Sequence, residues 1–590
     1  MTSKAPLGSS IIASDTCSVA STIEEKPGDQ IGRMNILLSA SSMASDLSHS
    51  ADKVAKDDPA IDKTPGNIKA DKDLAGATKT STASLFQFGA ETSSSSFLFH
   101  PKPIAANETA AYTEREQYMR LLHTEDNTMS GAHEQLRTAP LVSLSVKQRS
   151  VTKDNKLLIF PQYALLGCRM SDSCSSEGES DPMEPEPILL NTNTPWSMFI
   201  CGSQGSGKSY TLSAIIENCL YTSPKIGKLP KPLAGVVFHN NTRSSYDVCE
   251  AAHLVSLGIK VNVLVSRSNY HALWSIYRKA VSPQAARFLN IQPIVLQSQH
   301  LTAERMHRLM AFQEAKTVVP LYMEIILRIL REMAITGLPF SYAAFKARLS
   351  HESLQPGQTT MMNMRLNLLE SFLEPDCLVA TGMPNTRPKM DIFSIAQGTL
   401  TIVDLSDPFL DSNTTCTLFD ILLSLFVSSR PEAGMLVCLD EAHKFMKNTP
   451  AAEAFTDHLL TLIREQRHNA CRVVIVTQEP TVSPKLLDLC SITMVHRFTS
   501  ASWFVALREH LAAASDLVTT TEDGGKKRNV AAMFQKIIDL DAGESLLFAP
   551  SAVIEEVSDG KFKKLGTQHI RLKTRTRLGD DGGRSILAIR

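Results

Sequence analysis

The sequence predicts an α/β fold in which helices cover both faces of an open, mostly parallel sheet. Short, almost continuously apolar segments alternate with helix-like segments from residue 187 onward, which is typical of parallel strands buried on both faces. One of these segments, Met198–Cys201, runs into a glycine-rich loop that is followed by a helix-like segment. In open sheets of this class the ligand binds beyond the carboxyl ends of the strands.

The glycine-rich loop, residues 202–209, matches the phosphate-binding pattern G-x-x-x-x-G-K-[ST]. Its glycines let the backbone curl so that N–H groups point at phosphate oxygens, and the start of the next helix adds a positive field. Lys208 is expected to reach the terminal phosphates, and the Ser209 hydroxyl to bind Mg²⁺. The predicted nucleotide-binding residues are Gly202, Ser203, Gln204, Gly205, Ser206, Gly207, Lys208, Ser209 and Tyr210.

A second apolar strand, Met435–Leu439, ends in two acids that are expected to complete the nucleotide site. Asp440 is predicted to hold Mg²⁺ through water, and Glu441 to polarise the attacking water. Phosphoryl transfer needs positioned charges more than covalent chemistry from the protein. The chain has no N-K-x-D motif for reading guanine, which favours ATP, and no downstream Q-x-x-G-R-x-G-R element, which argues against a DEAH helicase.

Three further polar residues lie where they could assist catalysis. Gln478 follows the predicted strand 472–477, and it either senses the terminal phosphate or caps the strand. Arg464 and Arg467 lie in the helix-like segment before that strand. Either arginine could reach the nucleotide of a neighbouring subunit, or could serve only as a favourable charge at a helix carboxyl end.

Composition excludes several classes of protein. The chain has 590 residues and a formal net charge of −1, so any contact with nucleic acid or anionic lipid must be a local patch. Its eleven cysteines include no C-x-x-C pair, which indicates neither a disulfide framework nor a zinc site. No apolar run approaches the ~20 residues that span a bilayer. We therefore expect a cytoplasmic or nuclear protein without a membrane anchor.

The chain divides into six parts by composition and pattern. Residues 1–110 are polar and low in periodicity, so we expect a disordered tail. Residues 111–186 form a poorly defined region with a plausible strand at Lys156–Phe160 and an acidic linker at Ser171–Pro187. The remaining parts are the first half of the core (187–300), a helical insertion (301–395), the second half of the core (396–558) and a basic segment (559–590).

Within the core, periodicity and capping signals place the individual elements. Predicted strands occupy residues 233–238, 261–265, 294–296, 400–405, 435–439, 472–477 and 491–498. Predicted helices occupy residues 210–220, 303–312, 320–335, 361–373, 415–427 and 451–467. In the basic segment, residues 568–573 alternate like an edge strand, which either touches a phosphate backbone or is solvated and discourages edge-to-edge pairing.

The order of motifs resembles the HerA/FtsK branch of P-loop ATPases, and HerA more closely. The likeness rests on GSQGSGKS, LTIVDLS, MLVCLDEAH and IREQRHNACRVVIVTQEPT, and it covers roughly residues 189–511. It implies a RecA-like P-loop NTPase core, the use of ATP and Mg²⁺, and commonly a hexameric ring that moves DNA or another polymer. The family's N-terminal β-barrel is not evident in residues 1–185.

The same resemblance maps the family's motifs onto this sequence. Lys208 and Ser209 correspond to the first motif, and Asp440 and Glu441 to the second. Gln478 corresponds to the strand-tip glutamine, while Arg464 and Arg467 lie where the family carries basic residues near a subunit interface. Two functions follow as hypotheses: a Mg²⁺-dependent ATPase that acts on nucleic acid as a ring, and an ATP-dependent switch or scaffold that hydrolyses slowly.

Overall fold

The computed structural model describes residues 134–150, 159–170, 185–241, 248–310, 321–378, 391–510, 524–557 and 561–582. All of these residues belong to one compact unit, Thr109–Arg590. The tail predicted over residues 1–110 and the serines of the acidic linker lie outside the described residues.

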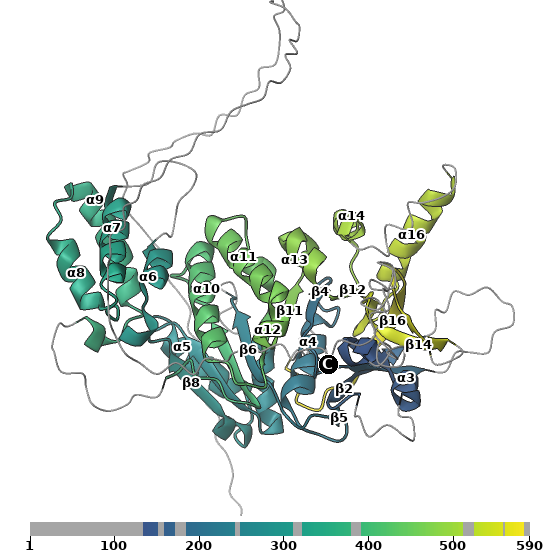
Figure 1. Ribbon diagram of the computed structural model, residues 1–590. Helices are drawn as coiled ribbons and strands as arrows, with labels where there is room; N and C mark the ends of the chain where they lie inside the picture. Colours follow the sequence, from purple (N-terminus) through teal and green to yellow (C-terminus); the bar gives the residue numbers. More distant parts are fainter. Residues whose placement is uncertain are drawn as a thin grey trace, which may run out of the picture. The chain divides into compact units, whose positions relative to one another are not determined.

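Within the described residues, eight parallel strands form one half of a 16-stranded sheet and reach one of its edges (Figure 1). All but the edge strand bury apolar side chains on both faces, as the continuous apolar runs predict. In sheet order they are β12 (Ile492–His496), β4 (Ser197–Cys201), β11 (Cys471–Thr477), β10 (Met435–Leu439), β6 (Ala234–His239), β9 (Thr399–Asp404), β7 (Lys260–Val265) and β8 (Leu289–Pro293).

Beyond β12 the sheet continues with strands from both ends of the described chain. The pairing becomes antiparallel, except that β1 and β14 are parallel. In order these strands are β13 (Glu544–Phe548), β16 (His569–Thr574), β2 (Tyr163–Arg169), β3 (Glu186–Leu190), β1 (Leu141–Ser143), β14 (Val553–Val557) and β15 (Lys561–Lys564), and β5 (Gly227–Lys228) pairs with β2. The segments before residue 190 and after residue 543 therefore share one antiparallel extension.

Helices cover both faces of the parallel strands, and neighbouring strand residues alternate between the two cores. Phe238 packs in the core beneath α10 (Ser412–Ser428) and α11 (Pro450–Arg464), while Val237 packs in the opposite core. The opposite face is covered by α4 (Lys208–Leu220), α5 (Tyr270–Ala280) and the 3-10 helix η1 (Glu250–Leu257). This arrangement confirms the predicted α/β fold, a mostly parallel sheet with helices on both faces.

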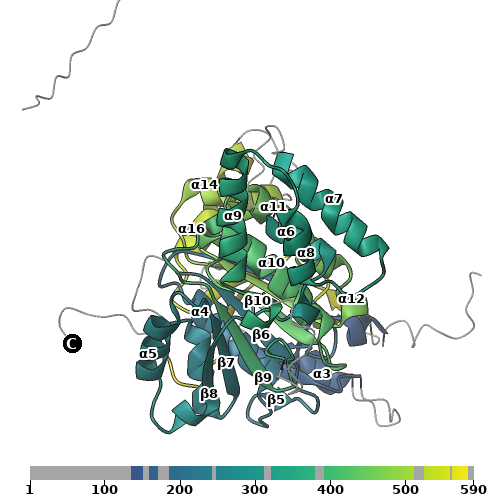
Figure 2. The ribbon, with the colours of Figure 1, turned by 90° about the vertical axis from the view of Figure 1, so that its left-hand side faces the viewer.

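In its described residues the helical insertion contains four helices (Figure 2): α6 (Ala303–Met310), α7 (Leu321–Ile335), α8 (Tyr342–Ser350) and α9 (Pro356–Glu370). Gly337 follows α7 with a positive φ, which is common where a helix ends. Arg308 of α6 donates a 2.7 Å hydrogen bond to Asp420 of α10, and His458 of α11 bonds the same carboxylate at 2.5 Å. A buried carboxylate thus joins the insertion to the helices of the core.

The remaining described elements are helices and 3-10 turns that connect the strands. The helices are α3 (Leu144–Arg149), α12 (Gln466–Asn469), α13 (Pro484–Leu489), α14 (Ala501–His510) and α16 (Gly524–Ile538). The 3-10 turns are η2 (Ala285–Phe288), η3 (Ser298–His300), η4 (Pro375–Cys377), η5 (Ala442–Lys444) and η6 (Pro480–Val482).

Three predicted strands differ in the structure. Residues 159 and 160 are not part of a strand, and the strand of that region is β2, which follows them. The strand predicted at 294–296 lies instead at Leu289–Pro293, because Pro293 ends the strand at a sheet edge and Ile294 and Leu296 turn into the core under the insertion. The predicted edge strand 568–573 corresponds to β16, which is interior because β2 covers its open side.

Some predicted helices also have other limits. The helix predicted at 361–373 is α9, which begins at Pro356 because proline is favoured at the first helical position. The helix predicted at 451–467 is interrupted at Glu465, where α11 ends and α12 begins. The sequence prediction did not include the described helices α3, α5, α8, α13, α14 and α16.

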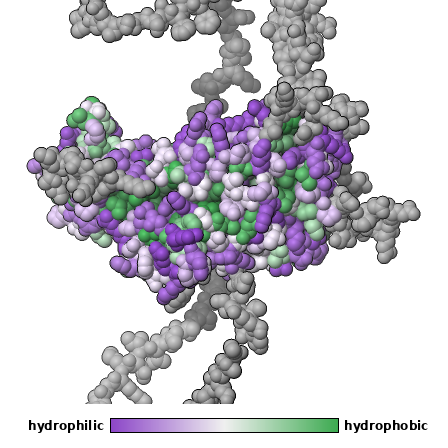
Figure 3. Space-filling view, turned by 90° about the horizontal axis from the view of Figure 1, so that it is seen from below, coloured by the Kyte–Doolittle hydropathy of each residue, from purple (hydrophilic) through white to green (hydrophobic). Residues whose placement is uncertain are grey.

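On the face shown in Figure 3, apolar residues lie mainly along the middle, interrupted by hydrophilic ones. Single exposed apolar side chains such as Trp274 and Phe409 are ordinary on folded proteins. Within the described ranges, no helix combines the length and the apolar character needed to cross a bilayer.

Candidate nucleotide-binding site

The phosphate-binding loop connects the central strand β4 to helix α4, and its glycines are required by crowding. Gly207 has a φ of 100°, and a Cβ atom there would lie 2.6 Å from the backbone N of Gly543. A Cβ atom on Gly202 would lie 2.7 Å from the Cβ of His496. Neither position can accept a side chain without moving backbone, so the loop keeps the tight curl that directs N–H groups inward.

Lys208 begins α4 and its side chain folds back over the loop. Its Nζ donates a 2.9 Å hydrogen bond to the carbonyl oxygen of Ser203 and thereby bridges the two ends of the loop. Burial lowers the pKa of Lys208, while the nearby carboxylates of Glu441 and Asp440 act in the opposite direction. The structure therefore brings the lysine and the two acids together, although they are more than two hundred residues apart in the sequence.

Asp440 directly follows β10, the second strand along from β4, and its side chain is almost fully buried. Its Oδ2 lies 3.1 Å from Nδ1 of His239, which ends the neighbouring strand β6. Its Oδ1 is buried and has no hydrogen-bond partner among the described residues. A carboxylate oxygen left free at this place suits a hydrated Mg²⁺, because that ion is bound by oxygen ligands and keeps several waters.

Glu441 adopts a backbone conformation that is rare for a residue with a side chain. Its φ of 53° is in the left-handed region, which costs about 1–2 kcal/mol for L-residues and is concentrated at functional sites. Its Oε2 accepts a 2.9 Å hydrogen bond from Nε2 of Gln478 and lies 3.4 Å from Nε2 of His443. Gln478 thus contacts the predicted water-polarising acid directly, which a simple strand cap would not require.

The wall of the loop comes from the C-terminal part of the chain. The backbone N of Gly543 donates to the carbonyl oxygen of Ser206 at 3.0 Å, and Thr574 bonds Thr211 of α4 through their hydroxyls at 3.0 Å. Tyr210, a predicted nucleotide-binding residue, accepts a 2.8 Å hydrogen bond from the backbone N of Arg577, whose guanidinium lies over its ring. No local sequence signal relates Gly543 or Arg577 to the loop.

Two basic residues of the C-terminal segment are internal. Arg575 is buried and pairs with the buried Glu217 of α4 at 2.8 Å, while Arg577 pairs with Glu250. The sequence left open whether this segment touches phosphate or is a solvated edge. These two arginines do neither, because they fasten the C-terminal segment across α4 and η1.

Arg464 and Arg467 lie at the opposite end of the sheet from the loop. Both are exposed and precede β11, whose last residue, Thr477, is paired with Cys201 at the start of the loop. A strand of seven residues at ~3.3 Å per residue separates them from the loop by about 20 Å. Neither arginine can therefore reach the phosphate-binding loop of its own chain.

His496 is a buried residue beneath the loop, and no sequence motif points to it. It ends β12, on the far side of β4 from the acids. Burial, and next the charge of Lys208, lower the pKa of His496 to about 4. It therefore remains neutral at physiological pH and adds no positive charge beneath the loop.

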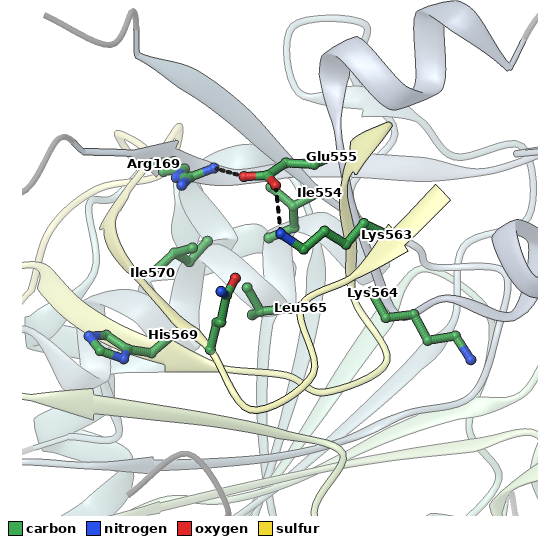
Figure 4. Close-up of a pocket in the computed structure, with 9 residues that line it drawn as sticks. Arg169, Ile554, Glu555, Lys563, Lys564, Leu565, His569 and Ile570 are labelled. Atoms are coloured by element: carbon green, nitrogen blue, oxygen red, sulfur yellow. Dashed lines mark hydrogen bonds and ion pairs between the residues drawn. The ribbon is translucent and has the colours of Figure 1, made fainter. Parts of the chain in front are cut away.

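Two hollows in the described surface lie away from the loop. One, of about 490 Å³, lies between α6, α7 and α8. The other is small and polar and is lined by β14, β15 and β16, where Arg169 and Lys563 both point toward Glu555 (Figure 4), at 3.3 Å and 3.5 Å. None of the predicted site residues lines either hollow.

No protein-family model matches the chain, and no curated protein does. Several solved structures are similar to it. VirB4 of Thermoanaerobacter pseudethanolicus has 11% identity and a TM-score of 0.38, covering 65% of this chain and 90% of its own. The plasmid coupling protein TrwB in complex with ADP and Mg²⁺ has 10% identity and a TM-score of 0.38, covering 72% and 97%. The genome packaging NTPase B204 from Sulfolobus turreted icosahedral virus 2 in complex with AMP has 13% identity and a TM-score of 0.18, covering 29% and 68%.

Proposed function

We propose that the protein binds ATP with Mg²⁺ and hydrolyses it. The observation that carries this proposal is the convergence of Lys208, Asp440, Glu441 and Gln478 at the carboxyl ends of parallel strands, next to the phosphate-binding loop. A structural role alone does not account for an orphan carboxylate oxygen on Asp440 and a left-handed backbone at Glu441.

Each residue of the site has a defined part in this proposal. The loop amides and Lys208 bind the β- and γ-phosphates, and Ser209 and Asp440 hold the cation. The cation, when bound, neutralises charge that develops on the phosphate oxygens. Glu441 orients the attacking water and takes its proton, and Gln478 holds Glu441 in the required orientation through its 2.9 Å hydrogen bond.

Action in trans by Arg464 or Arg467 belongs to the same proposal and requires an oligomer. Both side chains are exposed on the edge of the unit opposite the loop, as a head-to-tail ring would need. Arg464→Ala and Arg467→Ala should each be tested for phosphate release and for nucleotide affinity. A loss of turnover with unchanged affinity in one variant identifies that arginine as the one that acts on the neighbouring subunit. Wild-type turnover in both variants contradicts such a role.

The proposal includes a second step, in which ATP hydrolysis is coupled to movement on DNA. The experiment is the steady-state rate of phosphate release alone, and with single-stranded DNA, double-stranded DNA or RNA, together with size-exclusion chromatography in the presence of ATP. Stimulation by one polymer and a ring-sized species support a translocase. No hydrolysis under any condition would overturn the ATPase.

A second function, an ATP-dependent switch or scaffold, is favoured by one observation. Glu441 is engaged by both Gln478 and His443, an arrangement that could restrain it from activating water. In that case the protein binds ATP, hydrolyses it slowly and responds to no polymer. The helical insertion, joined to the core through Asp420, would then change its contacts between nucleotide states.

A further inference from the structure

His239 holds the carboxylate that is proposed to bind the cation. The two side chains come from neighbouring parallel strands, because β6 and β10 pair in register with Phe238 opposite Leu439. The residues just beyond that pair, His239 and Asp440, are therefore adjacent. Their contact, Nδ1 to Oδ2 at 3.1 Å, has almost no exposure to solvent, since the side chains are 5% and 6% exposed.

The contact leaves the two oxygens of Asp440 in different states. Oδ2 is held by the imidazole, whereas the buried Oδ1 has no hydrogen-bond partner in the described part of the chain. A carboxylate held through one oxygen cannot rotate freely, so its second oxygen keeps a fixed direction. Partners that orient metal-binding groups in this way typically change metal affinity or activity by about 10- to 100-fold when removed.

The side chains around His239 are buried. Asp404, opposite it on β9, is buried and accepts a 2.6 Å hydrogen bond from the Tyr277 hydroxyl. The ligand atoms of His239, Cys249 and Asp440 lie within 4.8 Å of one another. Mg²⁺ takes oxygen ligands, so in this group only Asp440 suits that ion, and the imidazole acts on it through the carboxylate.

We propose that His239 is a positioning residue, which fixes the Asp440 carboxylate so that Oδ1 faces the Mg²⁺ that accompanies ATP. This proposal rests on the proposed function. No local sequence pattern points to His239, because it lies two hundred residues before Asp440 and outside both nucleotide motifs.

The test compares two nearly isosteric variants, His239→Asn and His239→Leu. The asparagine amide can donate from the place of Nδ1, whereas leucine cannot donate at all. The readout is the affinity for a fluorescent, non-hydrolysable ATP analogue, titrated with Mg²⁺ and measured separately in EDTA. We expect His239→Leu to raise the Mg²⁺ concentration at half effect by about 10- to 100-fold. His239→Asn should stay within about threefold of the wild type, and affinity in EDTA should not change in either variant.

Cys249→Ala serves as the matched control, because it removes a neighbouring side chain that makes no hydrogen bond to Asp440 in the structure; its Mg²⁺ midpoint should equal that of the wild type. If His239→Leu does not fold, His239→Gln replaces it, since its amide reaches the place of Nε2 rather than Nδ1. An unchanged Mg²⁺ midpoint in the variant without the donor overturns the positioning role. A wild type that binds no nucleotide overturns the proposed function instead.

Discussion

The side-chain amide of Gln478 donates a 2.9 Å hydrogen bond to Oε2 of Glu441, across the tips of the neighbouring strands β11 and β10. Glu441 has a left-handed backbone, so its side chain is directed by a conformation that few residues adopt and is then held by one amide. The acid proposed to activate water is thus fixed from two sides.

Replacing Gln478 should reduce turnover more than binding. In Gln478→Ala the carboxylate of Glu441 loses its amide donor, and a misplacement of about 1 Å at a reacting group can cost about 100-fold in rate. We expect kcat to fall roughly 10- to 100-fold with KM for ATP almost unchanged, measured by phosphate release. An equal rise in KM with kcat preserved would instead assign Gln478 to nucleotide binding.

Glu441→Gln should separate binding from hydrolysis. The substitution keeps the size and hydrogen-bonding capacity of the side chain but removes the base, a contribution typically worth 10²- to 10⁴-fold. We expect the variant to retain nucleotide affinity, measured with a fluorescent analogue, and to lose phosphate release by that factor. Turnover at the wild-type rate would remove Glu441 as the base.

Lys208→Ala should abolish nucleotide binding. The ammonium group is buried beside the loop, where we expect it to contact the terminal phosphates. The matched control is Lys485→Ala, an exposed lysine at the start of α13, which should bind as the wild type does. Retained affinity in Lys208→Ala would contradict the site.

His496 should make the fold weaker in mild acid. Its pKa is lowered to about 4 in the folded protein, from an ordinary value of 6.5, so the unfolded chain binds the proton more readily. Stability contributed by the neutral imidazole is therefore complete above pH 6.5 and is lost as the pH falls toward 4, by up to about 3 kcal/mol.

The measurement is urea denaturation of the wild type and of His496→Leu between pH 7 and pH 5. Other histidines with lowered pKa values, such as His253 and His300, affect both proteins alike. The wild type should lose more stability than the variant over this range. Parallel pH profiles for the two proteins would show that His496 is not the source.

The ion pair between Arg575 and Glu217 should be required for stability. Both side chains are buried, at 4% and 0% exposure, and removing one partner of a buried pair typically costs 3–5 kcal/mol. Arg575→Met should therefore lower the free energy of unfolding by about that amount, measured in urea. Arg137→Met breaks the exposed pair with Glu134 and should cost about 1 kcal/mol or less. Similar losses in both variants would contradict the role of burial.

The sequence by itself determined the parallel core and the two nucleotide motifs. Strand β4, its glycine loop and helix α4 are consecutive, so their apolar run, glycines and helical pattern are readable within twenty-five residues. The same holds for β10 with Asp440 and Glu441, and for β11 with Gln478. Local periodicity reports which residues are buried, and burial on both faces is enough to predict a parallel strand.

Only the tertiary structure decided what surrounds those motifs. His239 reaches Asp440 because β6 lies beside β10, and Gly543 closes on Gly207 because β13 and β16 extend the sheet past β12. β16 is interior only because β2, some four hundred residues earlier, covers it. Strand order depends on contacts between distant segments, and a strand's own pattern shows that it pairs without showing with which partner.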